Sequence, residues 1–195
     1  MTFSAAFLRV DGFTDRAEGG YANHALDRGR GTRYGISSAA HPEVDLETLT
    51  PEGAREIRHR CYWLPIRGDE LPWPASLSLY DWCIHSADPR FASWVEKDFQ
   101  KLIGAKPDGD IGAETIKAVN VYCAQHGARA LAKHLLRLRT DAWDRGFKLG
   151  LFAPSTIDGI EYRPGNPIRV AAGMWCHRGF MNRALDLMAE LHTEV

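Results

Sequence analysis

Two acids and a threonine stand close together near the start of the chain, in the glycine-rich stretch from residue 18 to residue 37. Glu18 comes first, then Asp27, then Thr32. Hydrolysis of a glycosidic bond needs an acid that protonates the leaving oxygen and a second group that activates water or stabilises positive charge at the anomeric carbon. Glu18 and Asp27 are candidates for these two roles. The Thr32 hydroxyl is a candidate for holding a water beside Asp27.

The surroundings of the two acids favour different protonation states. Phe7 and Val10 belong to an apolar stripe at helical spacing, so residues 1–17 predict an amphipathic helix that ends at the paired glycines after Glu18. At 100° per residue, Glu18 lies about 20° from Phe7, on the stripe that faces the core. That position raises the expected pKa of the Glu18 carboxyl. Asp27, in a polar turn bordered by glycine, is expected to stay ionised.

Spacing alone leaves simpler interpretations open. Asp27 could cap the turn at Gly29, and Thr32 could be an ordinary strand residue. A structural role is less favoured for Glu18, because an acid at the C-terminal end of a helix meets the negative end of the helix dipole.

The elements that must position these residues are expected to be mainly α, with a small β-hairpin next to the site. The hairpin is predicted over residues 32–36. Residues 106–112 predict a tight turn and residues 150–167 a loop. Helix signals occur after Thr50-Pro51, after Trp73-Pro74, from Asp88-Pro89 to Gly104, over residues 116–123, over residues 131–142, and over residues 167–192.

Size and composition place the chain among soluble globular proteins. It has 195 residues, 45% of them apolar, and a formal net charge of -1. We therefore expect a monomer without membrane insertion and without a nucleic-acid partner. Arg129, Lys133, Arg137 and Arg139 are basic, but no nucleic-acid recognition motif accompanies them, and they could equally be the solvated face of a helix.

No metal or other cofactor is expected. The four cysteines are widely spaced, which predicts reduced thiols, and no H-E-x-x-H motif exists. The acidic run over residues 108–114 suggests calcium, but Glu114 comes too early for a twelve-residue calcium loop. A tight turn that leads into a helix is the simpler interpretation.

The stretch that contains the two acids has a more specific pattern, which is Glu18-Gly19-Gly20-Tyr21-x-Asn23 followed by Asp27-x-Gly29-x-x-Thr32-x-x-Gly35-Ile36. This pattern resembles the signature of glycoside hydrolase family 108, the phage-endolysin and secretion-associated N-acetylmuramidases. The similarity continues through Tyr62-Trp63-x-Pro65-Ile66-Arg67-Gly68-Asp69-x-Leu71-Pro72, Tyr80-Asp81 and Ser86.

The resemblance implies a lysozyme-like muramidase region over residues 1–92 whose catalytic set is Glu18, Asp27 and Thr32. Residue types suitable for sugar contacts lie in the same region, since saccharide pockets combine flat apolar surfaces with a few polar groups. The candidates for substrate binding are Tyr21, Asn23, Tyr34, Trp63, Asp81 and Trp82. Trp63 and Trp82 could equally be core residues, and Asp81 could brace the cleft instead of binding a sugar.

The second half, residues 93–195, resembles the helical, predicted peptidoglycan-binding region that accompanies this domain. It is expected to pack with the first half as one globule. The matching residues are Phe99-Gln100, Gly104, Asp108-Gly109-x-Ile111-Gly112, Thr115, Gly146-Phe147 and the region from Trp175 to Arg178.

The activity implied by the resemblance is cleavage of the β-1,4 bond between N-acetylmuramic acid and N-acetylglucosamine in bacterial peptidoglycan. The alternative is a non-catalytic peptidoglycan-binding or secretion-accessory protein on the same fold. The N-terminus has acids where a signal peptide would need an apolar run. We therefore expect synthesis in the cytoplasm without a signal peptide, then action on the periplasmic cell wall after release by a holin, a secretion system or lysis.

Overall fold

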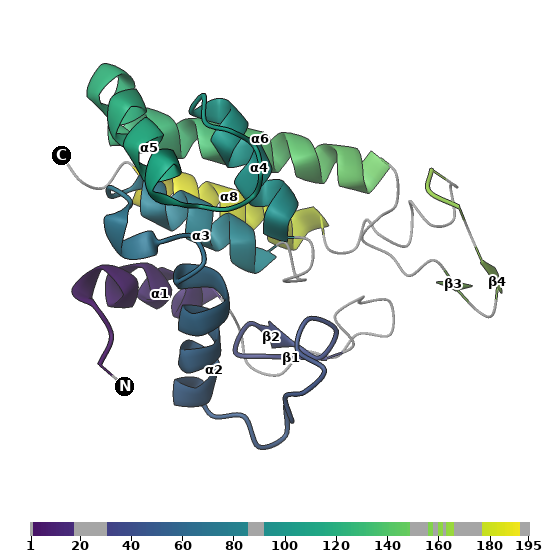
Figure 1. Cartoon of the computed structure of the whole chain (residues 1–195). Helices are drawn as coiled ribbons and strands as arrows, with labels where there is room; N and C mark the ends of the chain where they lie inside the picture. The colour runs from purple at the N-terminus through teal and green to yellow at the C-terminus, as the bar shows by residue number, and fades with distance from the viewer. Residues whose placement is uncertain are drawn as a thin grey trace.

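The computed structural model describes residues 2–17, 31–85, 92–148, 156–157, 160–161, 163–165 and 177–191. Most of these residues are helical, which confirms the mainly α class (Figure 1). The helices are α1 Ala5–Ala17, α2 Pro51–Arg58, α3 Ala75–His85, α4 Ala92–Leu102, α5 Ala113–His126, α6 Ala128–Lys148 and α8 His177–Glu190. The shorter elements are the π-helix η1 His59–Trp63, the 3-10 helix η2 Gly68–Glu70, and strands β1 Thr32–Arg33, β2 Ile36–Ser37, β3 Thr156–Ile157 and β4 Ile160–Glu161.

Helix α1 is the expected amphipathic helix. The Ser4 hydroxyl accepts a hydrogen bond from the Phe7 amide at 3.1 Å, which satisfies one of the free donors at the start of the helix. Phe7, Val10 and Phe13 are buried and anchor its apolar face in the core. The described part of the helix reaches Ala17, the residue directly before Glu18.

Strands β1 and β2 form the predicted hairpin. They pair antiparallel, with Thr32 opposite Ser37 and Arg33 opposite Ile36. The two-residue turn between them has positive φ at both positions, 52° at Tyr34 and 77° at Gly35. These signs are those of a type I′ turn, whose twist matches that of the flanking strands. The sequence prediction of a hairpin at this place is confirmed.

Helix α2 begins where the cap signal predicted. The Thr50 hydroxyl accepts from the Gly53 amide at 3.1 Å, and Pro51 takes the first helical position. The helix continues directly into the π-helix η1, where the Tyr62 hydroxyl and His41 Nε2 are 2.9 Å apart. That contact ties the loop after the hairpin to η1.

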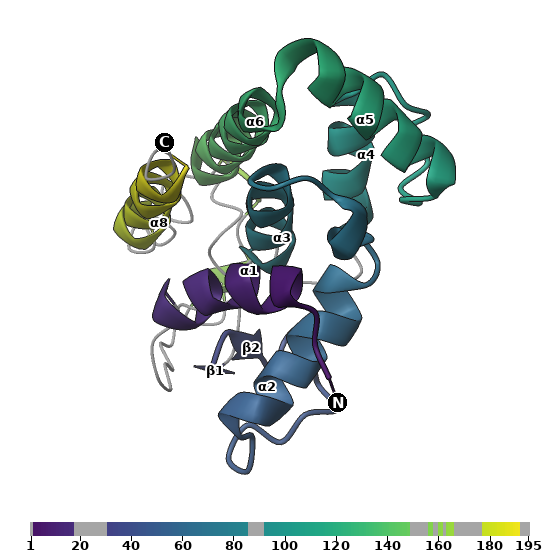
Figure 2. The same cartoon turned by 90° about the vertical axis from the view of Figure 1, so that its left-hand side faces the viewer.

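The core is built around α3. Residues 75–84 of this helix are all buried, because α1, α4 and α6 pack on different sides of it (Figure 2). One hydrophobic cluster extends from Phe7 on α1 to Leu191 after α8. A smaller cluster, formed by Ile36, Leu46, Leu49, Ala54 and Ile57, lies under the hairpin and α2.

The corner between α4 and α5 is the expected tight turn. Helix α4 ends before Gly104, whose φ is 73°. The buried Gln100 amide donates to Asp108 Oδ1 and to the Asp110 carbonyl, both at 2.9 Å. Its Oε1 accepts from the Gly109 amide at 2.7 Å. Side-chain bonds to Gln100 therefore shape the acidic turn.

One expectation needs correction, and two others lie wholly or partly outside the described residues. The segment 150–167 was expected to be a loop, but it contains a second short antiparallel hairpin, with Thr156 opposite Glu161 and Ile157 opposite Ile160. The segment contains three prolines and three glycines, and its two-residue strands are too short to leave an alternating pattern to detect. The predicted helix start at Asp88-Pro89 and the first part of the helix predicted over 167–192 lie outside the described residues.

Candidate active site

The described residues frame the predicted catalytic set without including all of it. Glu18 and Asp27 lie outside the described residues, as do the substrate-binding candidates Tyr21 and Asn23. Glu18 directly follows the end of α1, and Thr32 opens strand β1. The relation between α1 and the hairpin is therefore the part of the site that the structure defines.

Thr32 and Tyr34 lie on the same hairpin. Both side chains are half-buried, and the Tyr34 ring packs against the small cluster under the hairpin. The Arg33 guanidinium carbon lies 5.3 Å from the centre of the Tyr34 ring, and Arg33 Nη1 donates to the Leu46 carbonyl at 2.9 Å. The packing of Tyr34 on this cluster and the hydrogen bond of Arg33 to Leu46 therefore hold the hairpin in place.

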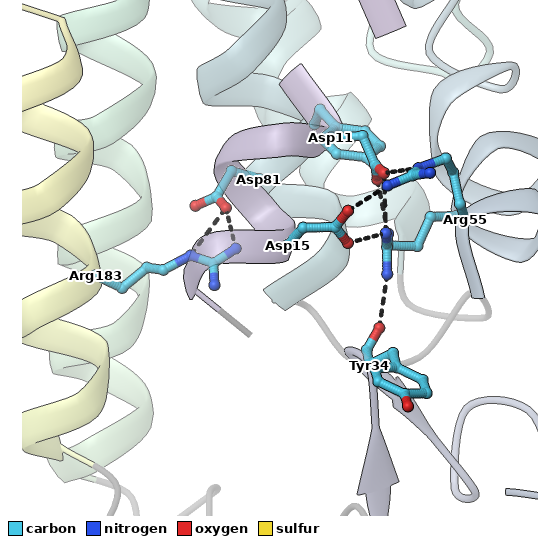
Figure 3. A network of polar contacts seen from close by, with 8 residues as sticks. Asp11, Asp15, Tyr34, Arg55, Asp81 and Arg183 are labelled. Atoms are coloured by element: carbon cyan, nitrogen blue, oxygen red, sulfur yellow. Dashed lines mark hydrogen bonds and ion pairs between the residues drawn. The ribbon is translucent and has the colours of Figure 1, made fainter. Parts of the chain in front are cut away.

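A buried ionic network centred on Asp11 joins α1 to its neighbours (Figure 3). Asp11 accepts from Arg58 Nε at 2.7 Å and Nη2 at 2.9 Å, from Arg55 Nε at 2.9 Å and from the Tyr80 hydroxyl at 2.8 Å. Burial alone would raise the pKa of the Asp11 carboxyl, but the hydrogen bonds and charge of Arg58 hold that pKa below its usual range. Asp11 is therefore ionised and fully satisfied, so it is poorly suited to be a proton donor.

The same network reaches the hairpin. Arg58 Nη1 donates to the Tyr34 carbonyl at 2.7 Å, while its Nη2 also donates to Asp15. Arg55 Nη2 pairs with the other Asp15 oxygen at 2.5 Å. This network was not predicted from the sequence. An acid on the apolar stripe of α1, four residues after Phe7, was the signal that could have revealed it.

Asp81 occupies a second buried ionic cluster. It accepts from Arg183 Nε on α8 at 2.9 Å and from Arg139 on α6, and none of its surface is exposed. Burial would raise the pKa of the Asp81 carboxyl, but the charges of Arg139 and Arg183 hold it well below its usual range. The expected sugar contact is wrong for this residue, and its role is the alternative one, to brace the helices.

The two tryptophans expected to stack on sugars are core residues. Trp63 is 0% exposed, with ring centres of Phe7 and Tyr80 at 5.7 Å and 5.6 Å from its own. Trp82 is 1% exposed and lies on the fully buried helix α3, 5.5 Å from the ring of Trp94. Neither ring has a free face, so the prediction that they bind substrate is wrong.

A concavity of about 760 Å³ lies at the α4–α5 corner, lined by Ile103, Lys106, Asp108, Glu114, Lys117 and Val121 among others. Figures 1 and 2 place this corner at the opposite end of the molecule from the β1–β2 hairpin. Within the described ranges, no group of His, Cys, Asp or Glu side chains could hold a metal ion. Cys61, Cys83 and Cys123 are free thiols, as expected.

Comparison with known protein families agrees with the resemblance that the sequence motif indicated. Residues 12–86 match the model of the family described as glycosyl hydrolase 108. The chain carries a glycosyl hydrolase 108 domain. It is a glycoside hydrolase, and the family implies peptidoglycan as its substrate. Among curated proteins, none matches the chain significantly.

A solved structure titled "Structure of Brucella abortus SagA" is similar over nearly the whole chain. The match covers 95% of this chain and 92% of that one, with a TM-score of 0.71 and 26% sequence identity. The fold is lysozyme-like, as expected from the motif. The glycosyl hydrolase 108 match ends near the end of α3, so Arg139 and Arg183 reach Asp81 from outside the matched region.

None of the helices in the described part of the chain is long and apolar enough to cross a membrane. The boundary between a catalytic region and a wall-binding region at residues 92 and 93 stays a prediction.

Proposed function

We propose that the protein is an N-acetylmuramidase that cleaves the β-1,4 bond between N-acetylmuramic acid and N-acetylglucosamine. The observation that carries the proposal is the complete set of Glu18, Asp27 and Thr32 inside the matched glycosyl hydrolase 108 region. The position of Thr32 also supports the proposal. Thr32 lies on a hairpin that is anchored to α1, and Glu18 is the residue that follows α1.

In the proposed reaction Glu18 donates its proton to the glycosidic oxygen as the bond to the anomeric carbon breaks. Asp27 stabilises the oxocarbenium-like transition state or takes a proton from the attacking water. Thr32 positions that water. The oxygen of water ends on the anomeric carbon, so the product has a new reducing end. This chemistry needs groups of the chain alone.

We further propose a phage-endolysin type of bacteriolytic role. The enzyme would be made in the cytoplasm and would act on the wall in the periplasm, after passage through a holin-dependent or dedicated secretion route. The family substrate supports this placement, because peptidoglycan lies outside the cytoplasmic membrane. The helical half after residue 92 would add affinity for the wall.

Digestion of purified peptidoglycan tests the reaction and the acid together. Wild type, Glu18→Gln and the control Glu52→Gln are compared by mass spectrometry of borohydride-reduced fragments. Glu52 is exposed in the first turn of α2, so its neutralisation should not change turnover. We expect reduced muramic acid ends from wild type and Glu52→Gln only.

Two other outcomes would overturn the proposal. Fragments released at amide bonds would make the protein an amidase or peptidase. Binding without release by wild type would favour the non-catalytic accessory protein.

A further inference from the structure

The turn of the catalytic hairpin contains a residue in an unfavourable backbone conformation. Tyr34 has a φ of 52°, in the left-handed region that side chains with a Cβ seldom adopt. Such a conformation persists only where the surrounding structure holds it, and such residues occur often at functional sites. Tyr34 lies two positions after Thr32, so whatever holds this turn also fixes the threonine.

Arg58 is the group that holds the turn from the core side. Its guanidinium is fully buried, and Nη1 donates to the Tyr34 carbonyl at 2.7 Å. Its Nε and Nη2 donate to Asp11, at 2.7 Å and 2.9 Å, and Nη2 also donates to Asp15. Both acids belong to α1, so one rigid, planar side chain spans from α1 to the hairpin.

We propose that Arg58 is a positioning residue for glycoside hydrolysis. It fixes the distance between the end of α1, where Glu18 follows, and the hairpin that carries Thr32. The inference rests on the proposed function, because that function makes Glu18 and Thr32 catalytic. A displacement of about 1 Å between reacting groups can lower a rate by about 100-fold. A single anchor at this junction therefore has a large effect on turnover.

Arg55 provides a matched control. It also comes from α2, and within the described contacts its hydrogen bonds go to Asp11 at 2.9 Å and Asp15 at 2.5 Å. It makes the same kind of ion pair as Arg58 without a hydrogen bond to the hairpin. Loss of either arginine removes charge pairing from α1, but loss of Arg58 alone releases Tyr34.

The test compares Arg58→Lys with Arg55→Lys on soluble peptidoglycan fragments. Lysine keeps the positive charge but replaces the planar fork with a single ammonium, so it cannot reproduce the whole set of bonds to Asp11, Asp15 and the Tyr34 carbonyl. At a temperature well below both melting temperatures, we expect Arg58→Lys to lower kcat at least ~10-fold with KM nearly unchanged. Arg55→Lys should keep kcat near the wild-type value. Equal kcat losses, or a wild-type kcat in Arg58→Lys, would overturn the inference.

Hydrogen exchange gives a second readout that does not depend on activity. The hairpin closes with the Ser38 amide donating to the Gly31 carbonyl at 3.0 Å. Amides of residues 31–38 should exchange faster in Arg58→Lys than in Arg55→Lys. Equal exchange in the two variants would overturn the positioning role. If wild type produced no reducing ends, the proposed function would fail, and the exchange data would still decide whether Arg58 anchors the hairpin.

Asp11→Asn serves if Arg58→Lys does not fold. The amide keeps the shape of Asp11 but turns one acceptor of the Arg58 fork into a donor. We expect the same fall in kcat and the same faster exchange at residues 31–38. A folded Asp11→Asn with wild-type kcat would overturn the inference.

Discussion

Asp81 on α3 and Arg183 on α8 are 102 residues apart in sequence, yet Arg183 Nε donates to Asp81 Oδ1 at 2.9 Å (Figure 3). Arg139 on α6 binds the other carboxylate oxygen. All three side chains are buried, so the Asp81 carboxylate compensates positive charge on both guanidinium groups at the junction of three helices. Removal of that carboxylate would take away a charge partner that the two buried arginines share.

We therefore predict that Asp81→Asn lowers the free energy of unfolding by about 3–5 kcal/mol at pH 7. Urea denaturation measures the loss. The control is Asp98→Asn, which breaks only the surface pair with Lys101 and should cost less than about 1 kcal/mol. A loss for Asp81→Asn no larger than for Asp98→Asn would contradict the bracing role.

The Asp81 contribution should also depend on pH. Its pKa is lowered in the folded state, so its stabilisation is fully present above the unfolded pKa of about 3.9 and is lost as pH falls below that value. The difference between wild type and Asp81→Asn should therefore be constant from pH 5 to pH 8 and shrink in stronger acid. A difference that instead grew toward acid would have the wrong sign.

Glu96 on α4 should show the opposite dependence. The residue is 6% exposed, and within the described part of the chain its Oε2 has no hydrogen-bond partner. Burial raises its pKa to about 7 from 4.5. The folded state thus binds a proton more tightly than the unfolded state, and Glu96 destabilises the fold increasingly as pH rises from 4.5 to 7. We predict that Glu96→Gln is more stable than wild type at pH 8, by about 1–3 kcal/mol.

Urea denaturation of wild type and Glu96→Gln at pH 4.5 and pH 8 checks this prediction. At pH 4.5 the Glu96 carboxyl is neutral in the folded state, so the two curves should nearly coincide. A stability difference that is the same at both pH values would show that ionisation of Glu96 is not its cause.

Gly68 should not tolerate a side chain, because it packs against the face of Trp63. A Cβ at position 68 would lie 2.3 Å from Trp63 Cδ2, well inside contact distance. We predict that Gly68→Ala lowers the melting temperature and costs about 1–3 kcal/mol or more. Gly112→Ala is the control, since a Cβ there meets nothing within 4 Å and its φ is -86°. Its cost should stay below about 1 kcal/mol.

A double variant identifies the cause of the Gly68 effect. Replacing Trp63 with leucine should create room, so Gly68→Ala should cost less in that background than in wild type. Additive losses would place the strain elsewhere. Trp63→Leu alone should weaken folding while leaving the affinity for saccharides unchanged, as expected for a core ring.

Gln100 is predicted to hold the α4–α5 corner. Gln100→Leu removes its bonds to Asp108, the Asp110 carbonyl and the Gly109 amide, at a cost of about 1–3 kcal/mol for the groups left unpaired. Amides of residues 106–112 should exchange faster, as mass spectrometry can measure. Gln125→Leu, at an exposed position on α5, is the control. Unchanged exchange at 106–112 in Gln100→Leu would assign the turn to its backbone alone.

Local signals predicted the local structure. The spacing of Phe7 and Val10 predicted α1, Thr50-Pro51 predicted the start of α2, and the Tyr34-Gly35 pair permitted the hairpin turn. Each of these depends on residues within one or two turns of the chain. They therefore leave a readable pattern in the sequence.

The role of a side chain was harder to predict where distant residues decide it. Trp63 has the same chemistry in a sugar pocket and in a core, and only the packing of Phe7 and Tyr80 decides between them. Asp81 joins the helices because it pairs with Arg139 and Arg183, and no sequence pattern near residue 81 indicates these partners. Glu18 and Asp27 lie outside the described residues, so their catalytic roles stay proposals.

The Asp81–Arg183 pair also has a consequence for biosynthesis. A ribosome adds roughly 5–20 residues per second, so the 102 residues between the partners take about 5–20 s to appear. During that time the nascent chain has an incomplete core around α3, and until residue 139 is made Asp81 lacks both of its arginine partners. We expect stalled ribosome complexes that end near residue 120 to be cut readily by protease within α3, and complexes that expose α8 to resist. Expression of the first half on its own would leave the enzyme in this early, vulnerable state.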